Sequence, residues 1–473
     1  MRPEFENHAL HFMGIGGSGM SGIARIALAR NYQVSGCDQI MSSTIEQLKR
    51  FGATVFIGHS DQHLAEMNNG DFLVLSTAIS QNHPEVIAAQ MKGVKLVHRS
   101  EVLAGLMRGF RSVAVAGTHG KTTTTSMLTV ALQNAGVNPS FAIGGAITSH
   151  SFNGHQGSGD IFVAEADESD GSFTNYKPYG AIITNIELDH VDHFPSLAEV
   201  EKIFNSFVNS IVEGGFLVAN VGCDRVAKLL QLNNRKDIRI FTYQSELNKS
   251  GESRESNYWL TNISLTESTS RARVVSNGKI LGELSLPVPG AHNLENALAA
   301  LIAGVELGID PKIFITGLEN FTGARRRFEK KGEVNQVTVI DDYGHHPTEI
   351  EATLKAARQY CPNGKIYVVF QPHRYSRTQA FATEFAKSLS FADEVFLTQI
   401  YPASEKNIPG VSSDLIVAAD NSGKIQLIPS LVEIINELVS QVKPGDLVIM
   451  LGAGDINSMA PALLNELETK FHK

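Results

Sequence analysis

The stretch Val113-Ala-Val-Ala-Gly-Thr-His-Gly-Lys-Thr-Thr-Thr-Thr125 decides the fold, because it leads from an apolar strand through a glycine-rich turn into a helix. Gly117 and Gly120 allow the turn to close tightly and to point its N–H groups inward. Lys121 adds a positive charge, and the hydroxyl of Thr122 is suited to hold Mg²⁺. The pattern predicts a binding site for nucleotide phosphates at the start of this helix.

The same stretch is the short form of a phosphate-binding loop. Val115 stands where the longer form has a further glycine. The helix is expected to end near Asn134, because Ala135-Gly136 follows and glycine terminates helices. A chance match is the alternative in a chain with 41 glycines, but the flanking strand and helix favour the phosphate site.

Composition restricts the class of protein. A chain of 473 residues with 42% hydrophobic and 19% charged residues is typical of a soluble protein of about three domains. The net charge of −9 argues against nucleic acid or an anionic membrane as partner, so anionic ligands need local cations. Cys37, Cys223 and Cys361 form no C-x-x-C pair, and no apolar stretch is long enough to be a signal sequence or a membrane span. We expect a cytoplasmic protein.

Apolar segments of strand length alternate with helical segments along nearly the whole chain, which predicts the α/β class with parallel sheets. Two breaks, near residues 106–111 and 321–327, are the expected domain boundaries. They divide the chain into domains 1–107, 108–322 and 323–473. The polar stretch 243–277, with alternating apolar positions, predicts antiparallel hairpins within the central domain.

The first domain opens with a second glycine-rich turn, Phe12-Met-Gly-Ile-Gly-Gly-Ser-Gly-Met-Ser-Gly22, and an acid, Asp38, follows at the end of the next strand. Such glycines let a pyrophosphate approach a helix N-terminus, and the acid is placed to accept a ribose hydroxyl. The turn therefore predicts a site for a nucleotide diphosphate; glycines kept for tight packing alone are the alternative. The candidate residues are Gly14, Gly16, Gly17, Ser18, Gly19, Met20 and Asp38, with His59 and Ser76 as further candidates.

Two acidic strand ends follow the phosphate loop. The first, Asp160–Asp170, places Glu165 where it can hold a Mg²⁺ ion that bridges triphosphate oxygens. For its other acids, Asp167, Glu168 and Asp170, a solvated acidic loop is as good an interpretation as a function.

The second strand end, Ala181–His193, carries two histidines three residues apart. A closed zinc site is improbable there, because no further cysteine or histidine ligands lie nearby in the sequence. A second Mg²⁺ or Mn²⁺ ion, held by His190 together with Glu165, suits the neighbouring phosphate loop better.

Seven motifs, in order along the chain, resemble those of the ATP-dependent Mur ligases. They are Gly117-Thr-His-Gly-Lys-Thr-Thr123, Glu165-Ala-Asp-Glu-Ser-Asp170, Asp189-His-Val-Asp192, Gly290-Ala-His-Asn-Leu-Glu-Asn-Ala297, Arg326-Arg-Phe328, Asp341-Asp-Tyr-Gly-His-His-Pro347 and His373-Arg-Tyr-Ser-Arg377. The resemblance implies a Rossmann-like domain that binds the UDP of a sugar substrate, a central ATPase domain with a parallel and a small antiparallel sheet, and a Rossmann-like C-terminal domain that closes over ATP and the amino acid.

The resemblance also implies roles for individual residues. ATP would be bound by Gly117, Thr118, His119, Gly120, Lys121, Thr122, Thr123, Asn293, Asn296, Arg327 and Asp342. The metals would be held by Thr122, Glu165 and His190, and the acceptor amino acid and the substrate carboxylate would be faced by Tyr343, His345, Arg374 and Arg377. The catalytic set would be Lys121, Glu165, His190, His345, Arg374 and Arg377. A carbamylated lysine, which relatives adding later amino acids use, is not expected, because residues 202–206 offer no equivalent.

The branch of the family that the motifs resemble most joins L-alanine to UDP-N-acetylmuramate with ATP as co-substrate, as a monomer or weak homodimer in the bacterial cytoplasm. Two alternatives lie outside ligation: a nicotinamide-dependent oxidoreductase, and a regulatory nucleotide-binding switch. The oxidoreductase would leave the Gly-Lys-Thr loop and both acidic strand ends without a role. Within the family, a branch that attaches a recycled peptide to the same carboxylate is the nearest alternative.

Overall fold

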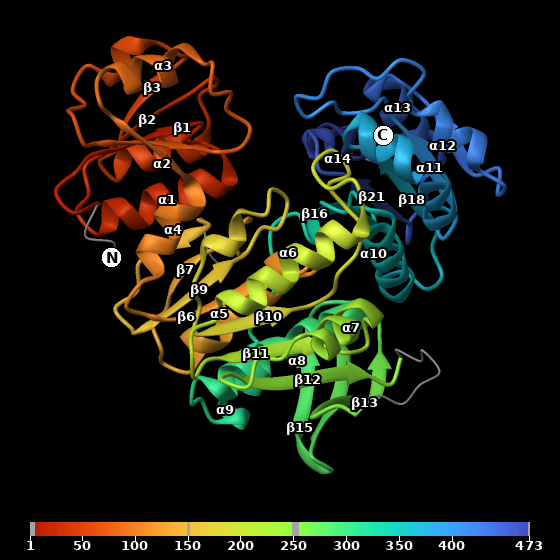
Figure 1. Cartoon of the computed structure of the whole chain (residues 1–473). Coiled ribbons are helices and arrows are strands. Elements are labelled where there is room, and N and C mark those ends of the chain that lie inside the picture. The colour runs from red at the N-terminus through yellow and green to blue at the C-terminus, as the bar shows by residue number, and fades with distance from the viewer. Residues whose placement is uncertain (1–4, 149–151, 248–254, 472–473) are drawn as a thin grey trace.

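The computed structural model describes residues 5–148, 152–247 and 255–471, which are built on three separate sheets (Figure 1). In Figure 1 the amino-terminal unit, coloured red to orange, and the carboxy-terminal unit, coloured teal to blue, both lie against the mainly yellow and green central unit. Parallel strands and helices alternate in all three units, which confirms the α/β class. In the described ranges, no helix combines the length and the apolar character that crossing a bilayer requires.

The amino-terminal unit contains a five-stranded parallel sheet in the order β3-β2-β1-β4-β5. The strand order reverses between β1 and β4, and ligands of open parallel sheets bind at such a reversal. The elements are β1 (Leu10–Met13), α1 (Ser18–Ala29), β2 (Val34–Asp38), α2 (Ser43–Arg50), β3 (Thr54–Ile57), η2 (Asp61–Leu64), β4 (Phe72–Leu75), α3 (Pro84–Met91), β5 (Lys95–His98) and α4 (Arg99–Met107).

The central unit contains a ten-stranded sheet in the order β15-β14-β13-β12-β11-β10-β6-β9-β7-β8. Its first elements are β6 (Arg111–Ala116), α5 (Lys121–Asn134), β7 (Ser140–Ala142), β8 (Gly154–His155), β9 (Ile161–Glu165), η3 (Ser172–Asn175), β10 (Gly180–Ile183) and α6 (Leu197–Ser210). The remainder are β11 (Phe216–Asn220), α7 (Asp224–Leu232), β12 (Arg239–Ser245), β13 (Tyr258–Leu265), β14 (Ser270–Ser276), β15 (Lys279–Leu286), α8 (Ala291–Glu306) and α9 (Pro311–Leu318).

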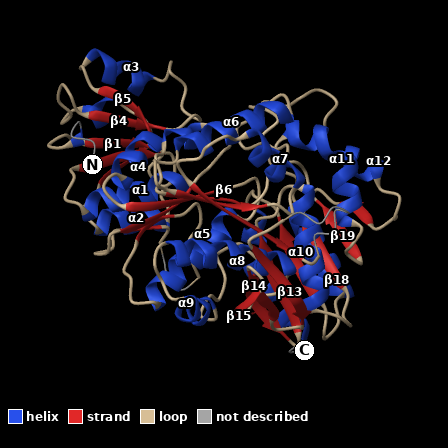
Figure 2. Cartoon of the chain, turned by 60° about the horizontal axis from the view of Figure 1, so that its bottom comes forward, coloured by secondary structure: helices blue, strands red, loops and turns tan. Residues whose placement is uncertain are grey.

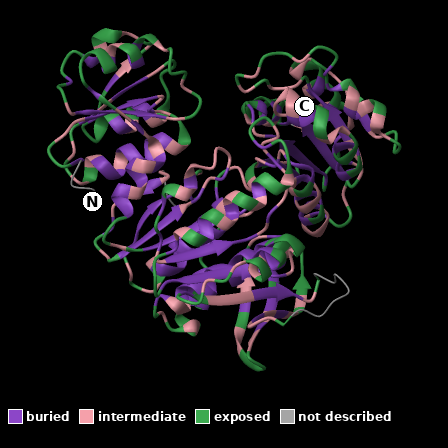
Figure 3. Cartoon of the chain, viewed as in Figure 1, coloured by how far each residue is buried: buried purple, intermediate pink, exposed green. Residues whose placement is uncertain are grey.

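The apolar run of β6 is explained by its burial on both faces. Val113 and Val115 pack into the core that contains α5 and α8, whereas Ala114 and Ala116 face the core that contains α6. Figure 2 shows these helices on opposite sides of the central strands, and Figure 3 shows the strands almost entirely buried. A strand covered on both faces cannot alternate between apolar and polar residues, so it appears in the sequence as a continuous apolar segment.

The polar stretch 243–277 differs in part from the predicted hairpins. β13 and β14 form the expected antiparallel hairpin, and β15 extends it. However, Tyr243 belongs to β12, which pairs with β13 in parallel. Residues 248–254 of the stretch lie outside the described ranges. The alternation of apolar and polar residues indicates strands but is the same for both pairing directions, so the sequence did not distinguish them.

The carboxy-terminal unit contains a six-stranded sheet in the order β16-β17-β21-β18-β19-β20, in which only the edge strand β16 is antiparallel to its neighbour. Its elements are β16 (Glu329–Val334), β17 (Val337–Asp342), α10 (Pro347–Tyr360), β18 (Ile366–Phe370), α11 (Tyr375–Leu389), β19 (Glu394–Leu397), α12 (Asp414–Ala419), β20 (Ile425–Leu427), α13 (Leu431–Gln441), β21 (Leu447–Leu451), η4 (Ile456–Ser458) and α14 (Met459–Phe471). β17 ends at Asp342, so the motif that follows it lies at the edge of the sheet facing the central unit.

Candidate active site

The glycine-rich turn between β6 and α5 depends on two glycines. Gly117 has φ of +140° and Gly120 has φ of +83°, values that residues with a Cβ atom rarely adopt. A Cβ atom on Gly120 would lie 2.7 Å from the amide oxygen of Asn296. The turn delivers the chain into α5, which begins at Lys121 and ends at Asn134 as the sequence predicted.

The amino group of Lys121 is held against the turn. It donates to the carbonyl oxygens of Gly117 (2.7 Å) and Thr118 (3.0 Å) and to the carboxylate of Glu168 (2.9 Å). Burial alone would lower the pKa of Lys121, but the carboxylates of Glu168 and Asp167 raise it above its usual value. Lys121 is therefore a permanent positive charge, and Glu168 lies beside it.

Burial raises the pKa of Glu168 to about 7, although Lys121 acts in the opposite direction. The sequence left this acid undecided between a solvated loop and a function. The structure buries it and pairs it with the lysine of the phosphate loop, so the solvated-loop interpretation is wrong for Glu168.

Thr122 and Glu165 lie together at the edge of the sheet. The hydroxyl of Thr122 donates to one carboxylate oxygen of Glu165 (3.0 Å), and the N–H of Gly144 donates to the other (2.6 Å). β6 and β9 are adjacent parallel strands, so the loop and Glu165 leave the sheet at the same edge. A hydroxyl and a carboxylate are hard oxygen donors of the kind that Mg²⁺ prefers, so these residues fit the predicted first metal.

The two other acids after β9 connect the central unit to the amino-terminal unit. Asp167 pairs with Arg99 at 2.9 Å, and Asp170 accepts a hydrogen bond of 2.6 Å from the hydroxyl of Thr77. His98 lies 3.5 Å from the same carboxylate of Asp170. These contacts place both acids at the junction between the units rather than on a free solvated loop.

His190 adopts a left-handed backbone conformation, with φ of +50°, in the loop that follows β10. Its Nε2 atom lies 3.8 Å from Glu168 and 3.7 Å from Asp189. The carboxylate oxygens of Glu165 are instead engaged by Thr122 and Gly144. Among the acids that follow β9, Glu168 and not the predicted Glu165 is therefore the one beside His190, where a second metal ion would bind.

His119 bridges two units. Its Nε2 atom lies 3.4 Å from Glu187, after β10, and its Nδ1 atom lies 3.3 Å from Glu349, in the first turn of α10. Burial would lower the pKa of His119, but the two carboxylates raise it to about 10. The protonated imidazole therefore joins the phosphate loop to the carboxy-terminal unit.

We expect the stability contributed by His119 to depend on pH. A histidine with a pKa of 6.5 when unfolded and about 10 when folded takes up a proton on folding, so its contribution is complete below pH 6.5 and is lost as the pH rises towards 10. The His119→Gln variant should unfold at least about 2–4 °C below the wild type at pH 6, a shift typical of ~1 kcal/mol in a domain of this size. Thermal unfolding from pH 6 to pH 10 tests this, with the exposed His193→Gln as control. A difference in Tm that stays constant across that range contradicts it.

Two arginines of the predicted acceptor site are bound to acids of the central unit. Arg377, on α11, donates to Asp189 from Nη2 (2.7 Å) and Nε (2.9 Å), and both side chains are almost completely buried. Arg374, with φ of +74°, forms an ion pair with Asp192. The predicted residues therefore meet at the junction, where they hold the carboxy-terminal unit against the strand end of β10.

A cavity of about 660 Å³ lies between the central and carboxy-terminal units. Seven of the residues predicted to bind ATP line it, namely His119, Gly120, Thr123, Asn293, Asn296, Arg327 and Asp342. Gly117, Thr118, Lys121 and Thr122 lie in the turn beside it. Arg327 is 3.4 Å from Glu349, whereas Asp342 accepts from the N–H groups of Phe328 (2.7 Å) and Gly344 (2.8 Å). Asp342 therefore fixes the backbone at Phe328, in the wall of the cavity, and at Gly344.

Tyr343 and His345 follow β17 at the same junction. The Nδ1 atom of His345 lies 3.0 Å from the carbonyl oxygen of Tyr343, and its Nε2 atom lies 4.0 Å from Asp189. Burial lowers the pKa of His345 to about 3, so its imidazole is neutral. The guanidinium of Arg327 lies 5.2 Å above the ring of Tyr343.

The first glycine-rich turn lies between β1 and α1, at the reversal of strand order. The N–H of Gly16 donates to Asp38 (2.9 Å), so this acid braces the turn, and a smaller cavity of about 210 Å³ is lined by Gly16, Ser18 and Arg325. Met20 is buried in the core, so only its backbone is available to a ligand. Among the other glycines of the turn, Gly14 has φ of +71°, Gly17 precedes α1 and Gly19 lies opposite Arg99. The two further candidates lie elsewhere in the unit: Ser76 follows β4, and His59 lies beside Cys37 and Glu85.

Sequence reasoning assigned no role to Glu187, Asp189 and Glu349, although Asp189 opens one of the seven motifs. Glu187 and Asp189 belong to an acidic strand end that was recognised, but the sequence did not show which of its acids turn inward. Nothing in the sequence marked Glu349 as a site residue. Acids are common in the first turn of a helix, because their negative charge interacts favourably with the helix dipole.

Comparison with known proteins gives the same family along the chain. Residues 9–111 match the model "Mur ligase family, catalytic domain", residues 115–304 the "Mur ligase middle domain", and residues 326–454 the "Mur ligase, glutamate ligase domain". The chain is 44% identical to a UDP-N-acetylmuramate–L-alanine ligase of Kineococcus radiotolerans, over 97% of this chain and 96% of that protein. It is 42% identical to the protein of the same name from Lawsonia intracellularis, over 96% and 98%.

Solved structures of ligases also match this chain. A UDP-N-acetylmuramate–alanine ligase from Thermotoga maritima matches with a TM-score of 0.80 and 28% identity, over 98% of this chain and 99% of that one. A murein peptide ligase from Psychrobacter arcticus matches with a TM-score of 0.72 and 25% identity, over the same shares. These matches confirm the resemblance that the seven motifs indicated, and the chain belongs to the Mur ligase family.

Proposed function

We propose that this chain joins L-alanine to the lactyl carboxylate of UDP-N-acetylmuramate and converts ATP to ADP and phosphate, a step in making peptidoglycan precursors. The observation that carries the proposal is the grouping of Lys121, Thr122 and Glu165 beside the large cavity, in a chain 44% identical over 97% of its length to a ligase of that name. The murein peptide ligase activity is the second candidate, because a structure of that name matches 98% of this chain.

The chemistry starts from a poor electrophile. An amine does not displace an oxygen from a carboxylate in water, because that oxygen is a poor leaving group. The proposed route therefore first transfers the γ-phosphoryl group of ATP to the carboxylate. The amine of L-alanine then attacks the acyl phosphate and phosphate leaves, so the new C–N bond replaces a C–O bond. Thr122 and Glu165 would hold one Mg²⁺ ion, or Mn²⁺, and His190 with Glu168 a second. Bound there, the metals would neutralise the charge of the phosphates.

The residues of the chain have separate roles in this proposal. Lys121 would turn from Glu168 to the phosphate oxygens, and Arg374 and Arg377 would face the substrate carboxylate and the amino acid. The neutral imidazole of His345 is suited to accept a hydrogen bond from the amine. Because its pKa is low, the imidazole is a weak base and would not retain the proton that the amine releases. We therefore propose that His345 positions the amine.

We further propose that Asn293 and Asn296 contact the adenine and that the glycine-rich turn of residues 14–20 binds the UDP group. The proposed domains are 1–107, 108–322 and 323–473. The proposed compartment is the cytoplasm, which suits three cysteines that are free in the structure. The proposed assembly is a monomer or weak homodimer.

A phosphate-release assay with UDP-N-acetylmuramate tests the function. We expect release to require the sugar nucleotide and L-alanine together, with a tripeptide and other amino acids tested in parallel. Substrate labelled with ¹⁸O in the lactyl carboxylate should deliver that isotope to the released phosphate. Unlabelled phosphate would overturn the acyl-phosphate route. Release with the tripeptide but not with L-alanine would favour the second candidate.

A further inference from the structure

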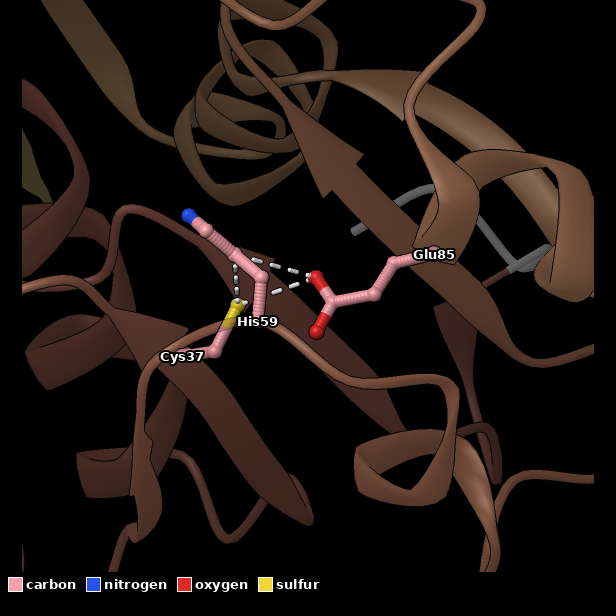
Figure 4. Close-up of side chains that lie close together, drawn as sticks. All are labelled: Cys37, His59 and Glu85. Atoms are coloured by element: carbon pink, nitrogen blue, oxygen red, sulfur yellow. Dashed lines mark hydrogen bonds and ion pairs between the residues drawn. The ribbon is translucent and has the colours of Figure 1, made fainter.

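A compact group of donor side chains lies in the amino-terminal unit, away from the ATP cavity. Cys37 lies near the end of β2, His59 follows β3, and Glu85 lies in the first turn of α3. Figure 4 shows the thiol, one edge of the imidazole and one carboxylate oxygen facing one another. The three donor atoms lie within 4.8 Å of one another, and neither the glycine-rich turn's proposed role nor the ligase chemistry uses Cys37 or Glu85.

The separations between these atoms match the edges of a coordination tetrahedron. Cys37 Sγ lies 3.3 Å from Glu85 Oε2 and 3.6 Å from His59 Nδ1, and His59 Nδ1 lies 3.3 Å from Glu85 Oε2. Zinc binds sulfur at about 2.3 Å and nitrogen or oxygen at about 2.0–2.2 Å in tetrahedral geometry, which places neighbouring ligand atoms about 3.3–3.6 Å apart. One ion therefore fits between all three donors without a large movement.

The carboxylate of Glu85 is already oriented for such a role. Its other oxygen, Oε1, accepts a hydrogen bond from the N–H of Ser60 (2.6 Å) and lies 2.9 Å from Nδ1 of His63. His63 is itself stacked on the ring of Phe56, with centroids 4.5 Å apart. Metal-binding carboxylates are commonly fixed in this way by outer hydrogen bonds, which leave one oxygen directed at the ion.

Access and selectivity also favour a metal ion. Cys37 and Glu85 are buried, but the side chain of His59 is 25% exposed, so an ion and one water molecule have an open side from which to enter. A donor set of thiolate, imidazole and carboxylate prefers thiophilic ions such as Zn²⁺ over Mg²⁺. The oxygen donors of Thr122 and Glu165 have the opposite preference.

We propose that Cys37, His59 and Glu85 form a Zn²⁺ site with a fourth position open to water. On binding, the thiol of Cys37 loses its proton to solvent and the sulfur takes the metal in its place. The ion would tie the ends of β2 and β3 to α3, next to the first glycine-rich turn. The carbonyl oxygen of Cys37 accepts from the N–H groups of Gly14 (2.8 Å) and Ile15 (3.1 Å), so the site is continuous with that turn.

Cobalt substitution tests the site in the full chain. Metal-free protein is titrated with Co²⁺ in the presence of excess Mg²⁺, which occupies oxygen sites. We expect a thiolate-to-cobalt charge-transfer band in the near ultraviolet that saturates at one ion per chain. The band should be lost in Cys37→Ser and kept in the matched controls Cys223→Ser and Cys361→Ser. No thiolate band in the wild type overturns the proposal, as does a band that persists in Cys37→Ser.

A second variant keeps the test decisive if Cys37→Ser fails to fold. Of the two Glu85 oxygens, His63 lies beside the non-ligating one, so His63→Gln should keep the charge-transfer band but weaken Zn²⁺ binding about 10–100-fold in competition with a chromophoric chelator. Wild-type Tm should also rise with Zn²⁺ concentration, because an ion that binds the folded chain stabilises it. Equal Zn²⁺ affinity in His63→Gln and wild type contradicts the proposed role of His63 in orienting the Glu85 carboxylate.

Discussion

The Lys121→Ala variant is expected to release ADP about 100-fold to 1,000-fold more slowly than the wild type. Lys121 is the one described cation whose amino group lies on the phosphate loop itself, where it donates to Gly117 and Thr118. Phosphoryl transfer moves negative charge, and removing one preorganised donor to such charge typically costs about 2.7–4 kcal/mol of transition-state stabilisation. Steady-state ADP release, measured with all three substrates saturating, gives the effect on kcat directly.

The matched control for this prediction is Lys202→Ala. Lys202 is exposed on α6, so the same chemical change there should leave the rate close to that of the wild type. Lys202→Ala also tests the expectation that no carbamylated lysine serves the second metal, because loss of activity would contradict that expectation. Wild-type ADP release by a folded Lys121→Ala variant would show that the loop does not stabilise the transferring phosphoryl group.

The Arg377→Met variant is expected to weaken the attachment of the carboxy-terminal unit by about 3–5 kcal/mol, because it leaves Asp189 buried without its cation. The pair joins α11 to the strand end after β10, so the loss falls on contact between two units rather than on either core. We expect a larger radius of gyration in small-angle scattering and faster proteolysis near residues 321–327.

Two further variants separate the pair from a general loss of stability. Arg271→Met changes an exposed arginine on β14 and should alter neither measurement. The double variant Arg377→Met with Asp189→Asn removes both charges, and it should recover part of the loss, because contacting residues show coupling energies of about 0.5–3 kcal/mol. Single-variant effects that simply add would exclude a direct interaction as the cause.

The phosphate loop, the α/β class and the family were all predictable from the sequence. The loop was predictable because Gly117, Gly120 and Lys121 are local requirements of a turn that binds phosphates. The gathering of strand ends was also predictable, since adjacent parallel strands such as β6, β9 and β10 must end at the same edge of their sheet. The individual roles assigned to these side chains stay predictions.

Other features depend on contacts between segments that are far apart in the chain, which no local pattern encodes. His119 becomes a cation at neutral pH only because α10 brings Glu349 to one side of it while Glu187 lies on the other. Glu168 appeared to belong to a polar loop in the sequence, yet folding buries it against Lys121. The parallel pairing of β12 with β13 was missed for a different reason, since the alternation of apolar and polar residues is the same for parallel and antiparallel strands.

The pairing of Lys121 with Glu168 gives the resting chain an internal stand-in for a phosphate group. Under the proposed function, a free orthophosphate or sulfate ion would have to displace the Glu168 carboxyl group, and it would gain few other contacts in return. A nucleoside triphosphate would also gain the walls of the adjoining cavity, so we expect it to displace Glu168 more readily than a small ion does. We therefore expect Lys121 to bind a complete nucleotide in preference to abundant small anions.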